Sequence, residues 1–375
     1  MSGAGPLPRR SDRNASDERT PKRVERLEIL PGYSISRLLK GGWHLSSGHS
    51  EGIERAQAIR DMASFVEAGI TSFDCADHYL GVEQMIGDFR RQHPELGRKI
   101  QIHTKYVPDW DALATLRPAD TVRVINRSLQ RLGVDTLDLV QFFWWNWNVP
   151  GAVETGLVLN DLQRQGKIRH IGVTNFTTPQ LKALVDGGVP VVVNQLQCSL
   201  VDDRAQRAQL PFCRDHGIAV VTYGHLLGGF IATDWIGKPE AGEPFANRSH
   251  KKYQLIIEDF GGWQLFQELL RALHAIGERL GVGPGEVALR WTLDQPGIAG
   301  CIVGATSTRT LARNQKVFDI ALADDDRAKL AAICARRSGP VGDCYELEND
   351  ATGRHGSIMR RNQNSLEDKP WPGTP

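Results

Sequence analysis

The sequence predicts a single-domain, closed parallel (β/α)8 TIM barrel, on three observations. Eight short apolar runs, many of them β-branched, alternate with segments of helical period, which is the order that a parallel barrel requires. The chain of 375 residues is longer than the roughly 250 that such a barrel needs. No dinucleotide fingerprint follows the first run, because Gly41-Gly42 is followed by Trp43 and His44. An open, doubly wound sheet is therefore disfavoured.

The predicted strands share one pattern. Each is short, mostly apolar and bounded by polar or glycine-containing segments, as is typical of strands that are buried on both faces. They are Ile35 to Leu39, Thr71 to Asp74, Ile100 to Lys105, Leu137 to Phe142, His170 to Val173, Pro190 to Gln195, Ile218 to Tyr223 and Gly300 to Val303.

Amphipathic helices are predicted between these strands. Apolar residues recur there at spacings of three and four, which places them on one face of a helix. The run Asp324 to Asp326 predicts a helix start, since acidic groups interact favourably with the positive end of the helix dipole. The predicted apolar faces are Ile59, Met62, Phe65 and Val66; Val122, Ile125, Leu129 and Leu132; and Leu265, Leu269, Leu273, Ile276 and Leu280.

Two arms flank the predicted barrel of residues 27–335. Residues 1–26 are rich in Arg, Ser, Asp and Pro and contain no apolar run, which predicts a flexible arm and no export signal. Residues 336–375 balance six basic against six acidic groups and lack a helical period, which predicts a disordered or extended tail.

The charge balance favours a small-molecule function. Lys and Arg number 45 against 44 Asp and Glu, so neither nucleic acid nor an anionic membrane surface is an expected partner. The longest apolar stretches are far shorter than the roughly 20 residues that a membrane helix needs. The six cysteines form no C-x-x-C pair, which is consistent with a reducing compartment, and we expect a cytoplasmic location. The oligomeric state does not follow from the sequence.

Polar residues at strand ends are the candidate catalytic groups, because barrel enzymes carry their chemistry at the carboxyl ends of the strands. Asp74 ends the second predicted strand, and Lys105 ends the third. Tyr79 follows Asp74 in a loop, so it can reach the same end of the barrel. A nearby ammonium would lower the pKa of the Tyr79 phenol and make it a general acid. The spacing fits a buried Asp-Lys pair beside a surface tyrosine equally well.

The chain resembles the aldo-keto reductase family over roughly Leu38 to Ile333. That family has a (β/α)8 barrel and uses a nicotinamide cofactor, usually NADPH, without a Rossmann domain. The motifs that carry the resemblance occur in the family's order. They are Phe73-Asp74-Cys75-Ala76-Asp77 with Tyr79; Lys105; Asp138-Leu139-Val140-Gln141; Gly166 to Phe176; Asn194-Gln195; Tyr223 with Leu226 and Gly229; and Gly304-Ala305-Thr306 up to Asn314.

The resemblance implies a role for each matching position. It implies that Tyr79 donates a proton to the substrate oxygen while Asp74 and Lys105 tune it. Thr174, Asn175 and Gln195 match positions that hold the nicotinamide carboxamide, and Tyr223 matches the ring that stacks on the nicotinamide. The remaining expected cofactor-binding residues are Leu226, Gly304, Thr306, Arg309, Arg313 and Asn314.

One departure from the family pattern concerns catalysis. The family has a histidine at the end of the fourth strand, where this chain has Phe143. Phenylalanine cannot donate a hydrogen bond, and loss of one such donor typically costs about 10²- to 10³-fold in rate. His44, His78 and His103 are candidates to compensate. His78 adjoins Tyr79 and is the preferred one, whereas His103 lies about 7 Å deeper than Lys105 at ~3.3 Å per residue, so we interpret it as a core histidine.

The substrate pocket is expected to be aromatic. Trp43, Phe143 and Trp145 are the pocket candidates, together with His78, and they suit a flat or apolar substrate. The same aromatic residues could instead form a hydrophobic plug under the loops.

NADPH is expected to be preferred over NADH. Its 2′-phosphate requires a cation near a helix N-terminus, and Arg309 and Arg313, one helical turn apart, could clamp it. No metal site is predicted, since the sequence contains no H-E-x-x-H motif.

The sequence therefore predicts an NADPH-dependent oxidoreductase that reduces the carbonyl group of a small aldehyde or ketone, with an imine as a further candidate substrate. Two alternatives stay open. One is a nucleotide-binding barrel with little turnover that acts as a redox sensor, which Phe143 would permit. The other uses Tyr79 for non-redox dehydration or cyclisation.

Overall fold

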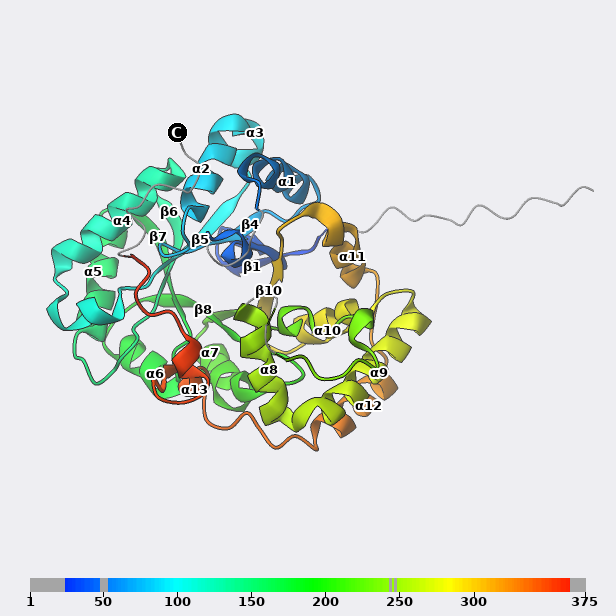
Figure 1. Ribbon diagram of the computed structural model, residues 1–375. Helices are drawn as coiled ribbons and strands as arrows, with labels where there is room; N and C mark the ends of the chain where they lie inside the picture. The colour runs from blue at the N-terminus through cyan, green and yellow to red at the C-terminus, as the bar shows by residue number, and fades with distance from the viewer. Residues whose placement is uncertain (1–23, 48–52, 243–244, 246–247, 365–375) are drawn as a thin grey trace, which may run out of the picture.

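The computed structural model describes residues 24–47, 53–242, 245 and 248–364, and its strands close into the predicted barrel (Figure 1). Within this part of the chain the strands follow one another in the order β10-β3-β4-β5-β6-β7-β8-β9, and each neighbouring pair is parallel. The strands are β3 (Leu38–Gly41), β4 (Ser72–Asp74), β5 (Gln101–Tyr106), β6 (Leu137–Phe142), β7 (Ile168–Thr174), β8 (Val191–Gln197), β9 (Ala219–Tyr223) and β10 (Ile298–Gly304).

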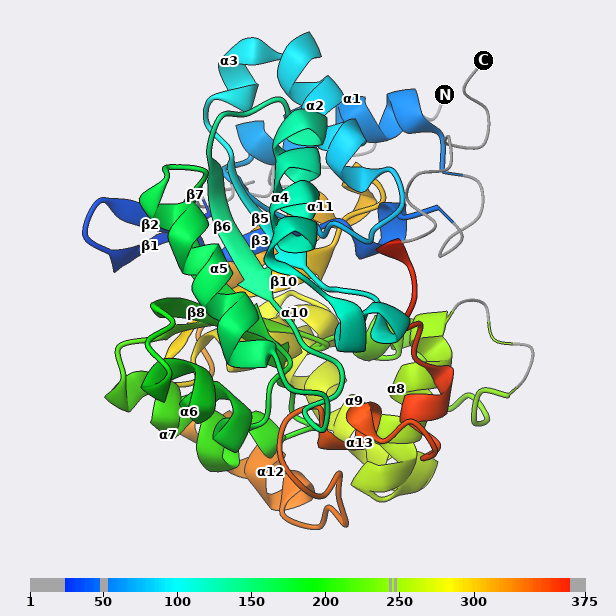
Figure 2. The same ribbon diagram turned by 90° about the vertical axis from the view of Figure 1, so that its left-hand side faces the viewer.

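The first predicted strand is divided between two elements. Its first residues belong to β2 (Tyr33–Ser36), which pairs in an antiparallel hairpin with β1 (Arg26–Leu30), and the barrel strand begins at Leu38. Only Ser36 and Arg37 interrupt the apolar run, so periodicity alone does not reveal the break. Figure 2 shows this hairpin at one end of the barrel, opposite the C-terminal residues in red.

The hairpin closes the amino-terminal end of the barrel. Tyr33 and Ile35 are buried in one cluster with barrel residues such as Leu39 and Leu139. The Tyr33 hydroxyl lies 3.1 Å from Nε2 of His103. His103 is fully buried, which confirms its interpretation as a core histidine, and burial lowers its pKa to about 4.

Helices surround the barrel, and the predicted apolar faces point inward. In α1, all four residues of the predicted face are buried, and in α9 four of the five are buried while Leu280 is partly buried. The helix that was predicted to start with acidic residues begins at Asp324, where the Asp326 carboxylate accepts a hydrogen bond from the Ala323 N–H. The helices are α1 (Arg55–Glu67), α2 (Val82–Gln92), α3 (Pro94–Gly97), α4 (Pro118–Leu132), α5 (Ala152–Arg164), α6 (Thr178–Asp186), α7 (Leu210–Asp215), α8 (Arg248–Phe260), α9 (Gly262–Leu280), α10 (Pro284–Leu293), α11 (Leu311–Gln315), α12 (Asp324–Cys334) and α13 (Glu346–Asn349).

Residues 336–364, here called the C-terminal segment, pack on the barrel. The sequence predicts a disordered or extended tail, and in these residues the chain is ordered and partly buried. The segment contains α13, and it crosses loops that follow barrel strands. The Thr178 N–H donates to Asp343, and the Trp110 N–H donates to the Arg361 carbonyl. Irregular backbone can be buried in this way because its polar groups find partners on the barrel loops. Its buried residues include Cys344, Tyr345, Glu348, His355 and Gln363.

A buried ion cluster fastens the C-terminal segment to the loop after β8. The Arg204 guanidinium lies 2.8 Å from Asp202 and 2.9 Å from Glu348, and all three side chains are at most 1% exposed. Burial alone would raise the pKa of Glu348, but the Arg204 guanidinium lowers it to about 2. Position 348 is thus held by charge as well as by packing.

The N-terminal arm falls almost wholly outside the described residues, which begin at Val24. Val24 is itself buried, and β1 begins at Arg26, so the fold starts slightly before the predicted boundary at residue 27. In the described ranges, no helix combines the length and the apolar character needed to cross a membrane.

Candidate active site

Asp74 and Lys105 form a buried ion pair at the carboxyl ends of β4 and β5. The Lys105 ammonium lies 2.8 Å from both carboxylate oxygens of Asp74 and donates to the Cys75 carbonyl at 3.0 Å. The two side chains are 5% exposed or less. Parallel strands in register place these ends next to each other, since Asp74 on β4 aligns with His103 on β5 and Lys105 lies two residues further along.

Two glutamines complete a polar network around Asp74. The Gln195 amide nitrogen donates to Asp74 at 2.6 Å and to the Gln141 carbonyl oxygen at 2.9 Å, and Gln141 donates to Asp74 at 3.2 Å. The Gln195 nitrogen is therefore used within the protein, which leaves its carbonyl oxygen for a ligand. We did not single out Gln141 as a site residue, although a polar residue near the end of a buried strand was the signal that could have found it.

Tyr79 lies beside this network in the loop that follows β4. The Lys105 ammonium is 5.1 Å from the centre of its ring, and the rings of Trp43 and His78 pack against it at 4.9 Å. The expected lowering of the Tyr79 pKa is wrong. Burial, followed by the negative charge of Asp74, raises that pKa well above 10, because Asp74 already neutralises the Lys105 charge.

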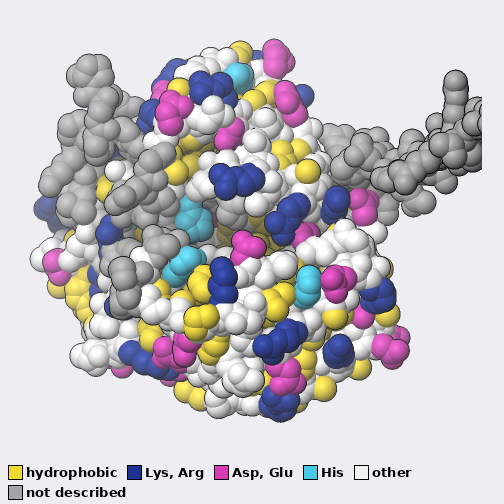
Figure 3. All heavy atoms as spheres, turned by 45° about the vertical axis from the view of Figure 1, so that its right-hand side comes forward, with side chains coloured by type: hydrophobic (Ala, Val, Ile, Leu, Met, Phe, Trp, Pro, Cys, Tyr) yellow, Lys and Arg dark blue, Asp and Glu magenta, His cyan; other side chains and the backbone are white. Residues whose placement is uncertain are grey.

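His78 and His44 lie at the same end of the barrel. The Nδ1 atom of His78 is 3.0 Å from the Asp77 carboxylate, which orients the ring against Tyr79. His44 Nδ1 lies 3.4 Å from the position that a Cβ would occupy at Gly304, so β10 ends close to the ring. Burial, together with the nearby His250, lowers the pKa of His44. On the face shown in Figure 3, histidine, basic and acidic side chains border a hollow.

Phe143 is buried in an aromatic cluster directly after β6. Its ring packs edge-to-face on Trp145 at 4.8 Å and on Tyr345 of the C-terminal segment at 5.7 Å, and it stacks on Phe176 at 5.6 Å. Phe143 is 2% exposed and Trp145 is 7% exposed. This packing fits the alternative interpretation of these residues as a hydrophobic plug under the loops. The substrate-binding role of Phe143 and Trp145 stays a prediction.

The residues expected at the nicotinamide end come together at the ends of β7, β8 and β9. The Tyr223 hydroxyl donates to the Asn175 side-chain oxygen at 2.6 Å, and Asn175 adopts a left-handed backbone conformation with φ of 61°. Thr174 is buried, and among the described residues its hydroxyl has no hydrogen-bond partner. The Lys252 ammonium, which we did not predict here, lies over the Tyr223 ring at 5.0 Å. A hydroxyl without a partner and an aromatic ring at the same end of the barrel fit an amide-bearing planar ligand.

The two arginines expected at the 2′-phosphate do not lie on one α-helix. Arg309 is exposed in a 3-10 turn (Thr308–Thr310), and α11 begins after it at Leu311. Gly304 and Thr306 are also exposed, whereas Asn314 is buried. The paired phosphate clamp stays a prediction, since the 3-10 turn continues directly into α11 and both arginines are exposed.

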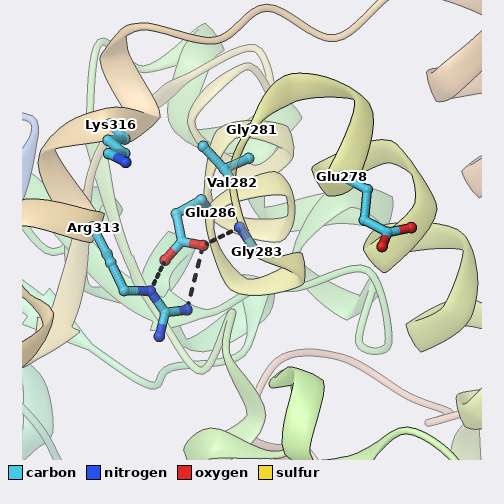
Figure 4. A pocket seen from close by; sticks show the side chains of 7 residues that line it. All are labelled: Glu278, Gly281, Val282, Gly283, Glu286, Arg313 and Lys316. Carbon is cyan, nitrogen blue, oxygen red and sulfur yellow. Dashed lines mark hydrogen bonds and ion pairs between the residues drawn. The ribbon is translucent and has the colours of Figure 1, made fainter. Parts of the chain in front are cut away.

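Arg313 is ion-paired with Glu286 at the edge of a cavity of about 260 Å³ (Figure 4). Its Nε lies 3.0 Å from the Glu286 carboxylate, which also accepts a hydrogen bond from the Gly283 N–H at 2.7 Å. Leu226 packs near Gly285, close to the start of α10. The cavity is lined by Glu278, Gly281, Val282, Gly283, Glu286, Arg313 and Lys316.

Metal ligands do not gather anywhere in the described parts of the chain, where no group of three or more His, Cys, Asp or Glu side chains could hold an ion. All six cysteines are buried and free.

Residues 37–335 match the Aldo/keto reductase family. The chain belongs to this family. It is 27% identical to the aldo-keto reductase YhdN of Bacillus subtilis over 321 residues, which cover 83% of this chain and 94% of that protein. It is 26% identical to the NADH-specific methylglyoxal reductase of Escherichia coli over 319 residues, covering 78% and 93% of the two chains.

A similar fold occurs in the crystal structure of an aldo/keto reductase from Klebsiella pneumoniae in complex with NADP and acetate. The TM-score is 0.62 at 22% identity, over 83% of this chain and 94% of that one. This similarity concerns the barrel fold, which the chain shares with members of an oxidoreductase family.

Proposed function

We propose that the protein is an NADPH-dependent reductase of a small carbonyl compound, with Tyr79 as the proton donor. The observation that carries this proposal is the buried Asp74–Lys105 pair beside the Tyr79 ring in an aldo/keto reductase barrel. Burying a lysine and a carboxylate together at strand ends costs desolvation energy. A costly ion pair of this kind beside a phenol is typical of a catalytic site.

The chain's own residues account for the proton transfer. Burial raises the pKa of Tyr79, so the phenol is protonated at neutral pH and gives up its proton only as negative charge develops on the carbonyl oxygen and makes that oxygen strongly basic. The Lys105 ammonium, 5.1 Å from the ring, offsets part of the negative charge of the phenolate that remains, and its ion pair with Asp74 limits this effect. A proton from solvent then restores the phenol, and the product is an alcohol. When bound, the reduced nicotinamide supplies the hydride that the carbonyl carbon receives.

Several residues support binding of the nicotinamide end. The Thr174 hydroxyl and the carbonyl oxygen of Gln195 are the atoms that would hold the carboxamide, and Asn175 is fixed by its hydrogen bond to Tyr223. Tyr223 offers a ring for stacking. The crystallised Klebsiella pneumoniae relative in complex with NADP supports the same cofactor class.

Arg309 is the residue that we propose for selecting NADPH. It is exposed after β10, whereas the Arg313 charge is neutralised by Glu286. The Escherichia coli relative is NADH-specific, so the preference is a property to measure in this chain.

Single-turnover oxidation of bound NADPH tests the proposal. The absorbance of the reduced cofactor would be followed with a panel of aldehydes, ketones and quinones for the wild type, Tyr79→Phe and Phe143→His. We expect turnover in the wild type and a loss of about 10²- to 10⁴-fold in Tyr79→Phe, with NADPH still bound.

The packing of Phe143 favours one alternative, a barrel that binds the nucleotide with little turnover. Phe143 offers no hydrogen-bond donor, and Tyr345 packs against it. No turnover in the wild type, with tight NADPH binding in both proteins and turnover in Phe143→His, would support this alternative and overturn the reductase.

A further inference from the structure

Arg361 in the C-terminal segment has hydrogen-bond donors that the described protein does not use. Its guanidinium carbon lies 5.2 Å from the Trp110 ring and 5.8 Å from the Trp145 ring. Its Nε and Nη2 atoms are buried, and within the described ranges neither has a hydrogen-bond partner. The same holds for the indole Nε1 of Trp145. Three buried donors on two touching side chains therefore lack acceptors.

Buried donors without acceptors are rare in folded proteins, because each has lost water without a replacement. The planar guanidinium presents Nε and Nη2 side by side, which is the geometry that accepts a carboxylate through two hydrogen bonds. The two tryptophan rings fix the orientation of the guanidinium and exclude water around it. The arrangement is therefore suited to an anion.

Aromatic contacts connect Arg361 to the candidate active site. Trp145 packs on Phe143, and Phe143 packs on Tyr345. Burial mainly raises the pKa of Tyr345, while the charge of Tyr79 raises it further and the charge of Arg361 lowers it. The Tyr345 hydroxyl is therefore close enough to interact electrostatically with both Tyr79 and the Arg361 guanidinium.

Lys252 is the other cation near this cluster, but its charge is balanced by the protein. Its ammonium lies between 5.0 and 5.6 Å from the rings of Tyr223, Tyr253 and Tyr345. Burial lowers the pKa of Lys252, and the nearby carboxylate of Glu348 opposes this. Together with the buried ion cluster, Lys252 makes a neutral set of charges.

The described carboxylates around the Arg361 part of the chain have other hydrogen-bond partners or are exposed. Asp109 accepts hydrogen bonds from the Gln363 and Asn364 N–H groups, and Asp111 accepts one from Asn362. Asp350, whose pKa the Arg361 charge lowers slightly after its own local hydrogen bonds, is exposed. An external anion is the acceptor that the site lacks.

We propose that Arg361 and the Trp145 indole bind the carboxylate of the substrate, so that the protein reduces aldehydes or ketones that carry a carboxylate at the end remote from the carbonyl. This inference rests on the proposed reductase function and specifies its substrate class. Arg361 selects the substrate, while Tyr79 protonates it. Entry of the carboxylate requires a small displacement of the C-terminal segment, since the donor atoms are buried.

Steady-state kinetics with matched substrates provide the first test. An ω-oxo acid of four or five carbons would be compared with its methyl ester in the wild type, Arg361→Met, Arg361→Lys and the control Arg360→Met. Arg360 is the exposed neighbour, and its replacement makes the same change in net charge. We expect Arg361→Met to lower kcat/KM for the oxo acid about 10- to 100-fold, mainly through KM. The loss for the ester should be at least tenfold smaller, and Arg361→Lys should recover only part of the difference.

Binding of glutarate, which cannot be reduced, provides a test that does not depend on turnover. Titration calorimetry on the full chain should detect glutarate binding in the wild type and Arg360→Met, and at least tenfold weaker binding in Arg361→Met. If no protein oxidises NADPH with any carbonyl but this difference persists, the reductase proposal fails while the anion site stands.

Three results would overturn the anion site. The first is that the wild type does not bind glutarate. The second is that Arg361→Met binds glutarate as tightly as the wild type. The third is that Arg361→Met loses equal activity on the oxo acid and on the ester, which would indicate a structural role for Arg361. A weaker affinity for NADPH without an effect on glutarate would assign Arg361 to the cofactor phosphates instead.

Discussion

Glu348 should make the stability of the protein strongly dependent on pH below about pH 5. Its side chain is fully buried, and the Arg204 guanidinium 2.9 Å away holds its pKa at about 2, against an ordinary value of 4.5. A folded pKa below the unfolded one means that the carboxylate stabilises the fold above pH 4.5. That contribution is lost as the pH falls towards 2.

The magnitude follows from the two pKa values. A difference of about 2.5 pH units, at about 1.4 kcal/mol per unit, corresponds to about 3 kcal/mol at neutral pH, of which about 2 kcal/mol is lost by pH 3. Replacement by glutamine removes the titrating group. Between pH 7 and pH 3, the free energy of unfolding of Glu348→Gln should therefore decrease by about 2 kcal/mol less than that of the wild type.

Urea denaturation at pH 7, 5, 4 and 3 measures this difference. Glu67→Gln is the matched control, because Glu67 is an exposed carboxylate on α1, far along the chain from the ion cluster. The control should follow the wild-type pH dependence. Parallel curves for Glu348→Gln and the wild type would refute the reasoning, since they would mean that the Glu348 pKa is the same in the folded and unfolded chains.

Two further predictions concern the candidate site. Lys105→Met leaves the Asp74 carboxylate buried without its cation and should lower the free energy of unfolding by about 3 to 5 kcal/mol. Adding Asp74→Asn should restore part of the lost stability, because the unpaired charge is then removed. Thermal and urea denaturation of the single and double variants measure the coupling energy between the two residues. Arg309→Ala should weaken NADPH binding about tenfold and NADH binding much less, because Arg309 is exposed beside β10 and its charge is not paired with Glu286 as that of Arg313 is. Arg313→Ala should have the smaller effect on the NADPH-to-NADH ratio of dissociation constants, since Glu286 already pairs with Arg313, and a larger effect would contradict this assignment.

Local pattern was sufficient to predict most of the barrel. A buried strand requires a short apolar run, so the runs around Phe73, Leu139 and Val193 indicated their strands directly. The first strand was less well defined, because the hairpin residue Ile35 and the barrel residue Leu38 are both fully buried and only two residues separate them. Periodicity reports burial, and it does not report to which sheet a residue belongs.

The sequence also indicated which polar residues meet at the barrel mouth, but it did not indicate their electrostatics. Asp74 and Lys105 could be paired from their places at neighbouring strand ends. The direction of the pKa change at Tyr79 could not be predicted from the sequence, because it depends on burial and on how far Asp74 cancels the Lys105 charge. The ion pair of Arg313 could not be predicted for a related reason, since its partner Glu286 lies 27 residues away in the sequence.

The C-terminal segment shows why a buried segment without regular structure is difficult to recognise in a sequence. Its backbone has little regular structure, so neither helical nor strand period indicates that it is buried. What holds it is a set of contacts between residues that are distant in the sequence, such as Arg204 with Glu348, 144 residues apart. Asp74, Tyr79 and Lys105 belong to the barrel and one of its loops, so a change at Arg361 is expected to alter substrate binding, as proposed, while these three residues keep their places. The two proposals together predict that proton transfer and substrate choice respond separately to mutation.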